Sequence, residues 1–256
     1  MKKFLSVIFP FISVAIFVLA YHIISLKVDS KIVAPQIDSI MKKIGVIVTK
    51  ENFAQIVFST LWRAIYGFII SLLLAIVFCI GANLSGVVEK LLYPLTMISR
   101  AIPTMSIVLL CLIWLDDKTP IAVSVIIVFP MLYSALLSAI KASDKEMKDV
   151  IKVYNVSKSK SFFRYYLPSV FLSVFPQLVT TLSFNVKLTI SGEALSNTSI
   201  SVGNAMKIAD FNTDTAQLFA WTIVAVLLGF AVELILKALY KIGERVRYGY
   251  RNRKFN

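Results

Sequence analysis

The feature that most constrains the fold is a series of six long apolar runs, separated from one another by polar segments. They cover residues 4–26, 58–82, 91–115, 121–140, 167–190 and 216–239. A helix needs about 20 mostly apolar residues to cross the hydrocarbon core of a bilayer. The sequence therefore predicts an all-α integral membrane protein with six transmembrane helices and with both termini on one side of the membrane.

The composition agrees with a chain whose surface faces lipid. Hydrophobic residues make up 58% of it and charged residues 16%, whereas about a quarter of a typical soluble domain is charged. Residues 1–256 are predicted to form a single membrane domain, because six spans leave little mass outside the bilayer. The first run has an alternative interpretation as a signal peptide with a cleavage site at residues 18–20. It continues past Ala20 for more than a turn, which favours a membrane span.

Lysine and arginine residues between the runs predict the orientation. One side would hold Lys2, Lys3, Lys90, seven basic residues at 141–164 and six in the C-terminal tail. On the other side, seven lysines are offset by seven acidic residues. Because cytoplasmic loops carry an excess of Lys and Arg, we predict cytoplasmic N- and C-termini. The formal net charge of +13 then reflects topology and anionic lipid headgroups, and not a nucleic-acid partner.

Patterns for catalysis, metal binding and nucleotide binding are absent from the sequence. His22 is the only histidine, and Cys79 and Cys111 lie inside apolar runs, where a thiol behaves as a small hydrophobic group. There is no Gly-x-x-x-x-Gly-Lys-Ser/Thr loop to bind phosphates. An intramembrane enzyme would need a nucleophile–base pair or a metal site. An ion-driven secondary transporter, the main alternative function, usually shows broken helices or an inverted repeat, and neither is evident here.

The longest loop on the predicted cytoplasmic side covers residues 144–164 and has the pattern of two short helices. Asp144 is a suitable N-cap, and the helix dipole favours the acidic Glu146 in the first turn. Asn155 tolerates the left-handed conformation that ends a helix. An apolar stripe at three- and four-residue spacing consists of Met147, Val150, Ile151 and Tyr154. The alternative is a solvated basic loop lying on lipid headgroups, but such a loop does not need an apolar stripe.

This loop resembles the "EAA" segment in the membrane subunits of ABC importers. That pattern consists of Glu-Ala-Ala, a Gly after three more residues, and a later Leu-Pro. Asp149-Val150-Ile151 take the Glu-Ala-Ala places, Asn155 takes the place of the Gly, and Leu167-Pro168 match outright. The departures keep an acidic helix start and a residue that can turn, which are the physical requirements of the pattern.

Further segments resemble the nitrate/sulfonate/taurine-type permeases within these importers. The string "SRAIPTMSIVLLCLIWL" at 99–115 is similar to their Arg-Ala-Ile-Pro segment, and "VAPQIDSIMKKI" at 33–44 is similar to their external helix. "GEAL" at 192–195 falls where they carry Ala-Glu-Met, and "SVGNAMKIADFNTDTAQLFA" at 201–220 is similar to their last external segment. The resemblance covers residues 33–240, the greater part of the chain.

The resemblance implies a type I ABC importer-like fold and a set of partners. A cytosolic ABC ATPase dimer would bind ATP and Mg²⁺, so this chain itself would bind no cofactor. A substrate-binding protein would dock on the outer face, and a second copy of this chain would complete a homodimer in the lipid bilayer of a bacterial cytoplasmic membrane. The solute would be small and polar, such as nitrate, a sulfonate, taurine or a vitamin precursor.

The resemblance assigns expected roles to residues of the loop, and the polar residues inside the fifth run indicate a path independently of it, because such groups are tolerated at membrane depth where they line protein or a water-filled cavity. The contact with the ATPase would be made by Glu146, Asp149, Ile151, Tyr154, Asn155 and Ser157. Near the outer end of the fifth run, the candidates for the translocation path are Asn185, Lys187, Ser191 and Glu193. Lys187 would meet an anionic group of the solute or an acid of a neighbouring span.

Other ionisable residues inside the apolar runs need an interpretation, because charge at membrane depth is costly. Arg63 and Glu233 are expected to extend to the membrane interface along their aliphatic stems. Arg100 directly precedes Ala101-Ile102-Pro103. It has two open interpretations, a structural role in a helix kink at Pro103 and contact with the solute in the translocation path.

Overall fold

The computed structural model describes residues 2–28, 30, 32–142, 153, 154, 156, 157 and 167–253, and every regular element among them is a helix. In chain order these are α1 (Lys2–Lys27), α2 (Ile37–Val48), α3 (Phe53–Leu84), α4 (Gly86–Ala101), α5 (Thr104–Leu115), the short 3₁₀ helix η1 (Asp116–Lys118), α6 (Thr119–Lys141), α9 (Leu167–Leu195), α10 (Val202–Phe211) and α11 (Thr215–Arg253). The predicted all-α class is confirmed.

The described helices include segments that are long and apolar enough to cross a membrane. Three segments meet both conditions: Phe53–Leu84, Thr104–Lys141 and Thr215–Ile242. The second of these comprises α5, η1 and α6, which follow one another without a gap. A shorter apolar helix covers Ile12–Lys27. The 29-residue helix α9 is not among the three, because Ser, Thr, Gln, Asn, Lys and Glu residues interrupt its apolar sequence. Six spans therefore remain a prediction.

The apolar run predicted at 91–115 is two helices and not one continuous span. Helix α4 ends at Ala101, Ile102 has extended backbone, and α5 begins at Thr104. Pro103 has no backbone N–H and restricts the residue before it to extended conformations. Its carbonyl accepts from the Ser106 amide at 3.0 Å. One helix thus ends here and a second begins, where the sequence indicated only a kink within a single helix.

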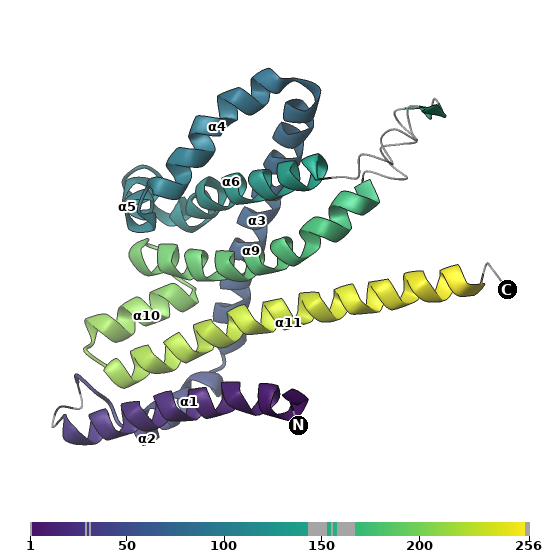
Figure 1. Ribbon diagram of the computed structural model, residues 1–256. Coiled ribbons are helices and arrows are strands. Elements are labelled where there is room, and N and C mark those ends of the chain that lie inside the picture. The colour runs from purple at the N-terminus through teal and green to yellow at the C-terminus, as the bar shows by residue number, and fades with distance from the viewer. Residues whose placement is uncertain are drawn as a thin grey trace.

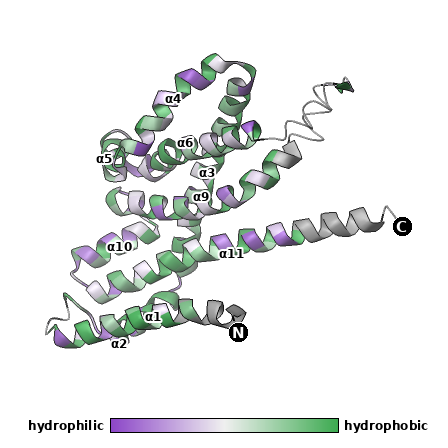
Figure 2. Ribbon diagram, in the orientation of Figure 1, coloured by the Kyte–Doolittle hydropathy of each residue, from purple (hydrophilic) through white to green (hydrophobic). Residues whose placement is uncertain are grey.

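Helices α6, α9 and α11 lie side by side, and α3 runs across them (Figure 1). The N end of α1 and the C end of α11 lie toward the right of that view, whereas α2 and α10 lie toward the left. Figure 2 shows mainly hydrophobic residues along α1, α3 and the first half of α11, and more hydrophilic ones on α10. This arrangement agrees with a bundle that places its termini at one end.

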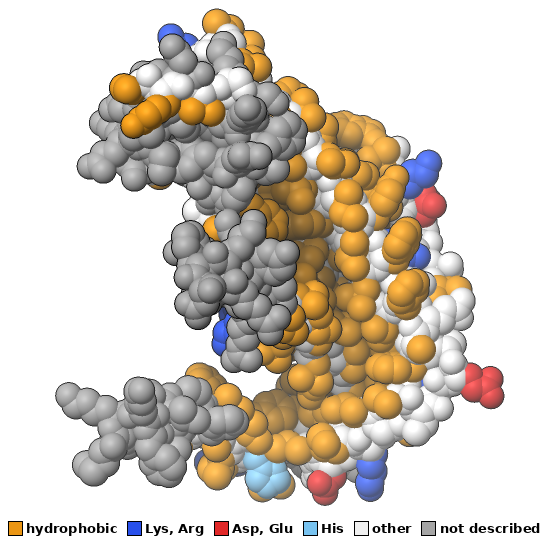
Figure 3. Space-filling view, turned by 90° about the vertical axis from the view of Figure 1, so that its right-hand side faces the viewer, with side chains coloured by type: hydrophobic (Ala, Val, Ile, Leu, Met, Phe, Trp, Pro, Cys, Tyr) orange, Lys and Arg blue, Asp and Glu red, His pale blue; other side chains and the backbone are white. Residues whose placement is uncertain are grey.

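Much of the described surface is apolar. Figure 3 shows hydrophobic side chains over a broad, continuous area, with the charged side chains at its borders. Phe17 on α1 is 75% exposed, and Ile113 on α5 is 76% exposed. Soluble monomers rarely show continuous apolar patches of more than a few hundred Å², so this surface requires lipid or another protein chain around it.

A stripe of small residues on α3 lets this helix pack closely against α6. Ala64, Ser71 and Ala75 are completely buried, and the Ser71 hydroxyl donates to the Gly67 carbonyl at 2.8 Å. A Cβ atom on Gly67 would come within 2.6 Å of the Ser124 Cβ atom on α6. Small residues at such spacing are the usual means of close helix packing in membranes, where dispersion contacts replace the hydrophobic effect between helices.

We predict that Gly67→Ala destabilises the protein by about 1–3 kcal/mol, because the new methyl group must separate α3 from α6. Gly45→Ala is the matched control: Gly45 lies inside α2 with nothing within 4 Å of its Cβ position, so alanine there should stabilise the helix by about 0.5–1 kcal/mol. The measurement is the thermal unfolding midpoint of the purified protein in detergent. Equal midpoints for the two variants would contradict the close α3–α6 contact.

Candidate functional site

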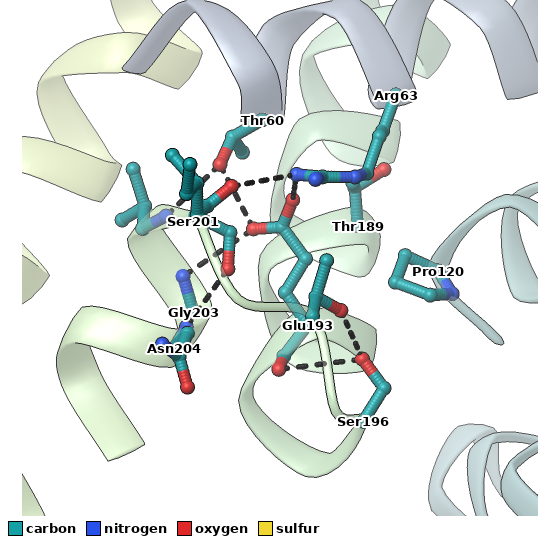
Figure 4. A network of polar contacts seen from close by, with 12 residues as sticks. Thr60, Arg63, Pro120, Thr189, Glu193, Ser196, Ser201, Gly203 and Asn204 are labelled. Carbon is teal, nitrogen blue, oxygen red and sulfur yellow. Dashed lines mark hydrogen bonds and ion pairs between the residues drawn. The ribbon is translucent and has the colours of Figure 1, made fainter. Parts of the chain in front are cut away.

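A buried polar cluster joins the C-terminal end of α9 to α3 and α10 (Figure 4). At its centre is Glu193, whose side chain has no exposed surface. A carboxylate in such a place is stable only if its charge is matched and its oxygens are hydrogen-bonded. The surrounding residues meet both conditions.

Three donors from two other helices reach the Glu193 carboxylate. Arg63 Nη1 lies 3.0 Å from Oε1, and the Thr60 hydroxyl donates to Oε2 at 2.9 Å. The Gly203 amide, at the start of α10, donates to Oε2 at 3.3 Å. One carboxylate therefore fixes α9, α3 and α10 relative to one another.

The partners of Glu193 are themselves held in place. Arg63 Nη1 also donates to the Ile200 carbonyl at 3.1 Å, and the Thr60 hydroxyl accepts from the Val202 amide at 3.0 Å. The Arg63 side chain is 23% exposed. The expectation of an Arg63 side chain that extends to the membrane interface did not include this acidic partner, Glu193. Its acidic partner lies 130 residues away in the chain, so local sequence could not indicate the pair.

Gly203 is required at the close approach of α10 to α9. A Cβ atom there would lie 2.4 Å from the Ile190 carbonyl oxygen and 2.5 Å from the Glu193 Cβ atom. No side chain larger than hydrogen fits that space. The Ser201 hydroxyl caps α10 by accepting from the Asn204 amide at 3.0 Å, so the helix begins where its first amides face the carboxylate.

A second feature is an open groove of about 750 Å³ between α4, α6 and α9. Its α6 wall runs from Ile127 to Ala142, and most of its residues beyond Met131 are serine or alanine. Ser173 and Gln177 line it from α9. The volume lies within the range of about 300–1,000 Å³ that is usual for small-molecule sites.

Arg100 is the only charged residue lining this groove in the described part of the chain. It lies in the last turn of α4, where the negative end of the helix dipole favours a cation. None of the hydrogen bonds or ion pairs formed among the described residues involves it. Ser99 beside it also lines the groove, and its hydroxyl donates to the Thr96 carbonyl at 3.0 Å.

Of the five predicted path residues, only Arg100 lines the groove. Glu193 is in the buried cluster, and the Asn185 side chain is buried with its Nδ2 donating to the Ala64 carbonyl at 2.7 Å. Lys187 is exposed on α9, close to Gly229 of α11, and has no ion pair with a described residue. Ser191 is exposed and its hydroxyl donates to the Lys187 carbonyl at 3.1 Å.

Sequence reasoning missed the groove residues Ser134, Ser138 and Gln177. A signal was available, because Ser134, Ala135, Ser138, Ala139 and Ala142 recur at the spacing of one helix face. A face of small residues on an apolar helix leaves space for a ligand or another chain beside it.

Glu233, which lies inside the last apolar run, pairs with Lys237 one turn later on α11 at 2.5 Å.

The predicted contact with an ATPase falls mostly on residues outside the described part of the chain. Glu146, Asp149, Ile151 and Asn155 lie there. Tyr154 is described, with 76% of its surface exposed, and Ser157 is also exposed. The role of this segment therefore stays a prediction.

At the opposite end of the bundle, polar contacts join α2 and the loops around α10. Lys43 of α2 pairs with Asp214, which directly precedes α11. The Thr215 hydroxyl donates to the Ile32 carbonyl at 2.6 Å, and Asn197 Nδ2 donates to Asp116 at 2.8 Å. The hydrogen bond from Lys43 holds the pKa of the Asp214 carboxyl below its ordinary value.

A family model described as "Binding-protein-dependent transport system inner membrane component" matches residues 67–245. No curated protein gives a significant match to the whole sequence.

Two solved structures resemble the fold. An amino acid ABC transporter, described as a crystal structure with histidines, has a TM-score of 0.61 at 13% identity, covering 76% of this chain and 95% of that one. The methionine ABC transporter MetNI in an inward-facing conformation has a TM-score of 0.51 at 13% identity, covering 74% of this chain and 99% of that one.

We predict that Arg63→Met destabilises the protein by about 3–5 kcal/mol, because it leaves the buried Glu193 carboxylate without a counter-charge. Lys237→Met is the matched control, since it removes a lysine from the exposed pair on α11 and should cost less than about 0.5 kcal/mol. Thermal unfolding in detergent measures both. The double variant Arg63→Met/Glu193→Met should be more stable than Arg63→Met alone. If Arg63→Met lowers the stability no more than Lys237→Met does, the pairing of Arg63 with Glu193 is contradicted.

We predict that Lys43→Met returns the pKa of Asp214 to the ordinary aspartate value, near 3.8. In the folded protein the pKa of Asp214 is depressed. The ion pair therefore stabilises the fold fully at any pH above the pKa that Asp214 has in the unfolded chain. That contribution is lost as the pH falls through the lower folded-state pKa. A ¹³C-detected titration of the carboxyl groups measures the change. An identical Asp214 titration in both proteins would contradict the contact.

Proposed function

Because this chain belongs to the family of binding-protein-dependent transport system inner membrane components, it is an ABC importer permease and not an enzyme, and we propose that it forms the translocation path for a small polar solute. The observation that carries this proposal is the family match over residues 67–245. The fold shared with two ABC transporters and the groove beside Arg100 support it.

The energy for transport comes from a separate cytosolic ABC ATPase dimer, which binds ATP and Mg²⁺. The sequence contains no phosphate-binding loop of its own, and its longest predicted cytoplasmic segment connects α6 to α9, two of the groove-lining helices. We assign the ATPase contact to residues 144–164, with Glu146, Asp149 and Asn155 at its centre. Closure of the ATPase dimer would then tilt α6 and α9.

The complete transporter contains two copies of this chain in a cell membrane of bacterial type. Each copy is a single domain with six spans and cytoplasmic termini. The N end of α1 and the C end of α11 lie at the same end of the bundle (Figure 1), as this topology requires. The groove is open on one side, and a second copy would close it. A substrate-binding protein docks at the opposite end, where α2 and α10 lie.

The predicted path residues divide into two groups by their surroundings. Arg100, Lys187 and Ser191 are exposed in the single chain, and we assign them to the path surface. Glu193 and Asn185 are buried, so they act on the path by fixing the position of α9. Resemblance to the nitrate/sulfonate/taurine-type permeases in "SRAIPTMSIVLLCLIWL" supports that subtype.

We predict that uptake into proteoliposomes, by this chain assembled with the ATPase and the binding protein encoded beside it, requires internal ATP. Collapse of the ion gradients should leave uptake unchanged. The assay is accumulation of the labelled ligand of the binding protein. Uptake that continues without ATP and stops when the ion gradients collapse would assign the chain to secondary transporters instead.

We also predict that Asp149→Lys/Asn155→Pro uncouples ATP hydrolysis from uptake, because it reverses the charge at the helix start and rigidifies the turn after it. Uptake should fall by at least tenfold, or about 1.4 kcal/mol in coupling free energy. Asp117→Lys is the matched control, with the same charge reversal on an exposed residue of η1. Uptake by the double variant equal to that of Asp117→Lys would contradict the coupling role.

A further inference from the structure

We propose that the groove beside Arg100 binds a negatively charged group, a carboxylate, sulfonate or phosphate, on the solute that this chain transports. The inference rests on the proposed function and adds the chemical class of the solute and the residue that recognises it. Four properties of the groove support it: its charge, its wall, the prolines inside its helices and its size.

Among the described residues, Arg100 provides the only charge that lines the groove. Arg100 has no acidic partner among the described residues, and the other lining residues are uncharged. Arg63, the other arginine of the spans, shows what the fold does with a structural cation, because it pairs with Glu193 at 3.0 Å. A guanidinium stays charged in proteins and binds carboxylate, sulfonate or phosphate oxygens through two parallel hydrogen bonds. An anion is therefore the ligand that completes this site.

The α6 and α9 walls of the groove provide room and neutral hydrogen-bonding groups. Along α6 the groove extends from residue 127 to residue 142, which is about 22 Å at the rise of an α-helix. Ser134 and Ser138 lie on this face among alanines, and Gln177 lies on the α9 side. The serine hydroxyls can donate hydrogen bonds to an anion without adding a competing charge, and so can the second N–H of the Gln177 amide, whose Nε2 also donates to the Thr181 hydroxyl at 3.3 Å.

All three helices that form the groove contain an internal proline: Pro94 in α4, Pro130 in α6 and Pro176 in α9. Each proline removes one amide from the helix ladder and frees the carbonyl four residues earlier. In a membrane protein, backbone of this kind is tolerated where it borders protein or a water-filled cavity. A hydrated groove is thus consistent with the backbone as well as with the side chains.

The volume of about 750 Å³ suits a small organic anion with its hydration water. The apolar residues Ile127, Met131 and Phe184 at one end of the groove give such a solute a surface for its carbon skeleton. A phospholipid headgroup carries the same phosphate chemistry. The experiment must therefore distinguish a soluble anion from a lipid.

The test introduces Ser138→Cys as a reporter in the full chain, purified in maltoside micelles, which contain no phosphate. The two native cysteines are buried, and the chain without the reporter serves as the blank. The rates of modification by a sulfonate-bearing methanethiosulfonate and by its trimethylammonium counterpart give a ratio that reports the local charge. We expect Arg100→Gln to lower this anion-to-cation ratio by on the order of tenfold. Lys118→Gln, which removes a lysine from exposed η1, should leave it unchanged.

Binding itself is measured by protection of the reporter. We expect 2-hydroxyethanesulfonate, acetate or inorganic phosphate to slow its modification by the neutral reagent N-ethylmaleimide several-fold, and to lose this effect in Arg100→Gln. Arg100→Lys keeps the charge without the paired hydrogen-bond geometry. It should therefore retain the rate ratio and show weaker protection, which separates recognition from any loss of fold in Arg100→Gln.

Three results would overturn the inference. The first is a rate ratio that Arg100→Gln does not change, and the second is a changed ratio without protection by any of the three anions. The third is protection only in nanodiscs that contain phosphatidylglycerol, which would assign the groove to a lipid headgroup. If ATP-driven uptake by the complete transporter persists alongside any of these, the anion site fails and the importer function stands.

Discussion

The ion pair between Arg63 and Glu193 is the contact on which the arrangement of the helices depends. It joins residues 130 positions apart in the chain, and the carboxylate it neutralises has no exposed surface. Because the same carboxylate accepts from Thr60 and from the Gly203 amide, α9, α3 and α10 meet at one point. Removing one partner would leave a buried charge unmatched, whereas an apolar pair could not hold α10 by its backbone.

Small residues have two different results in this fold, and the difference lies in what faces them. On α3, Gly67 and Ser71 face Ser124 of α6, so these small residues bring two helices into close contact. On α6, the serine and alanine residues beyond Met131 face the groove. Close packing against α3 fixes the position of α6. The small residues of α6 that line the groove leave space between α6 and α4. The same residue types thus build both the rigid part and the open part of the chain.

Apolar runs predicted the helical class, the approximate bounds of α3 and α6, and the start but not the end of α11, because hydrophobicity over about 20 residues is a strong local signal. The break between α4 and α5 was underestimated, since a proline indicates a kink as readily as a complete break. The site was harder to predict: Arg100 was found from its charge, but Ser138 and Gln177 carry no such signal. The pairing of Arg63 was missed, because it depends on a helix that lies far away in the sequence.

The contrast between the two arginines of the spans gives the clearest indication of function. Both carry a charge that is costly at membrane depth. Arg63 is neutralised by Glu193, whereas Arg100 has no acidic partner among the described residues and lines a groove. A fold selected only for stability would match or remove the second charge. The presence of this second charge, in a chain that belongs to a transport family, agrees with the proposal that its partner is the transported solute, which arrives and leaves with each cycle.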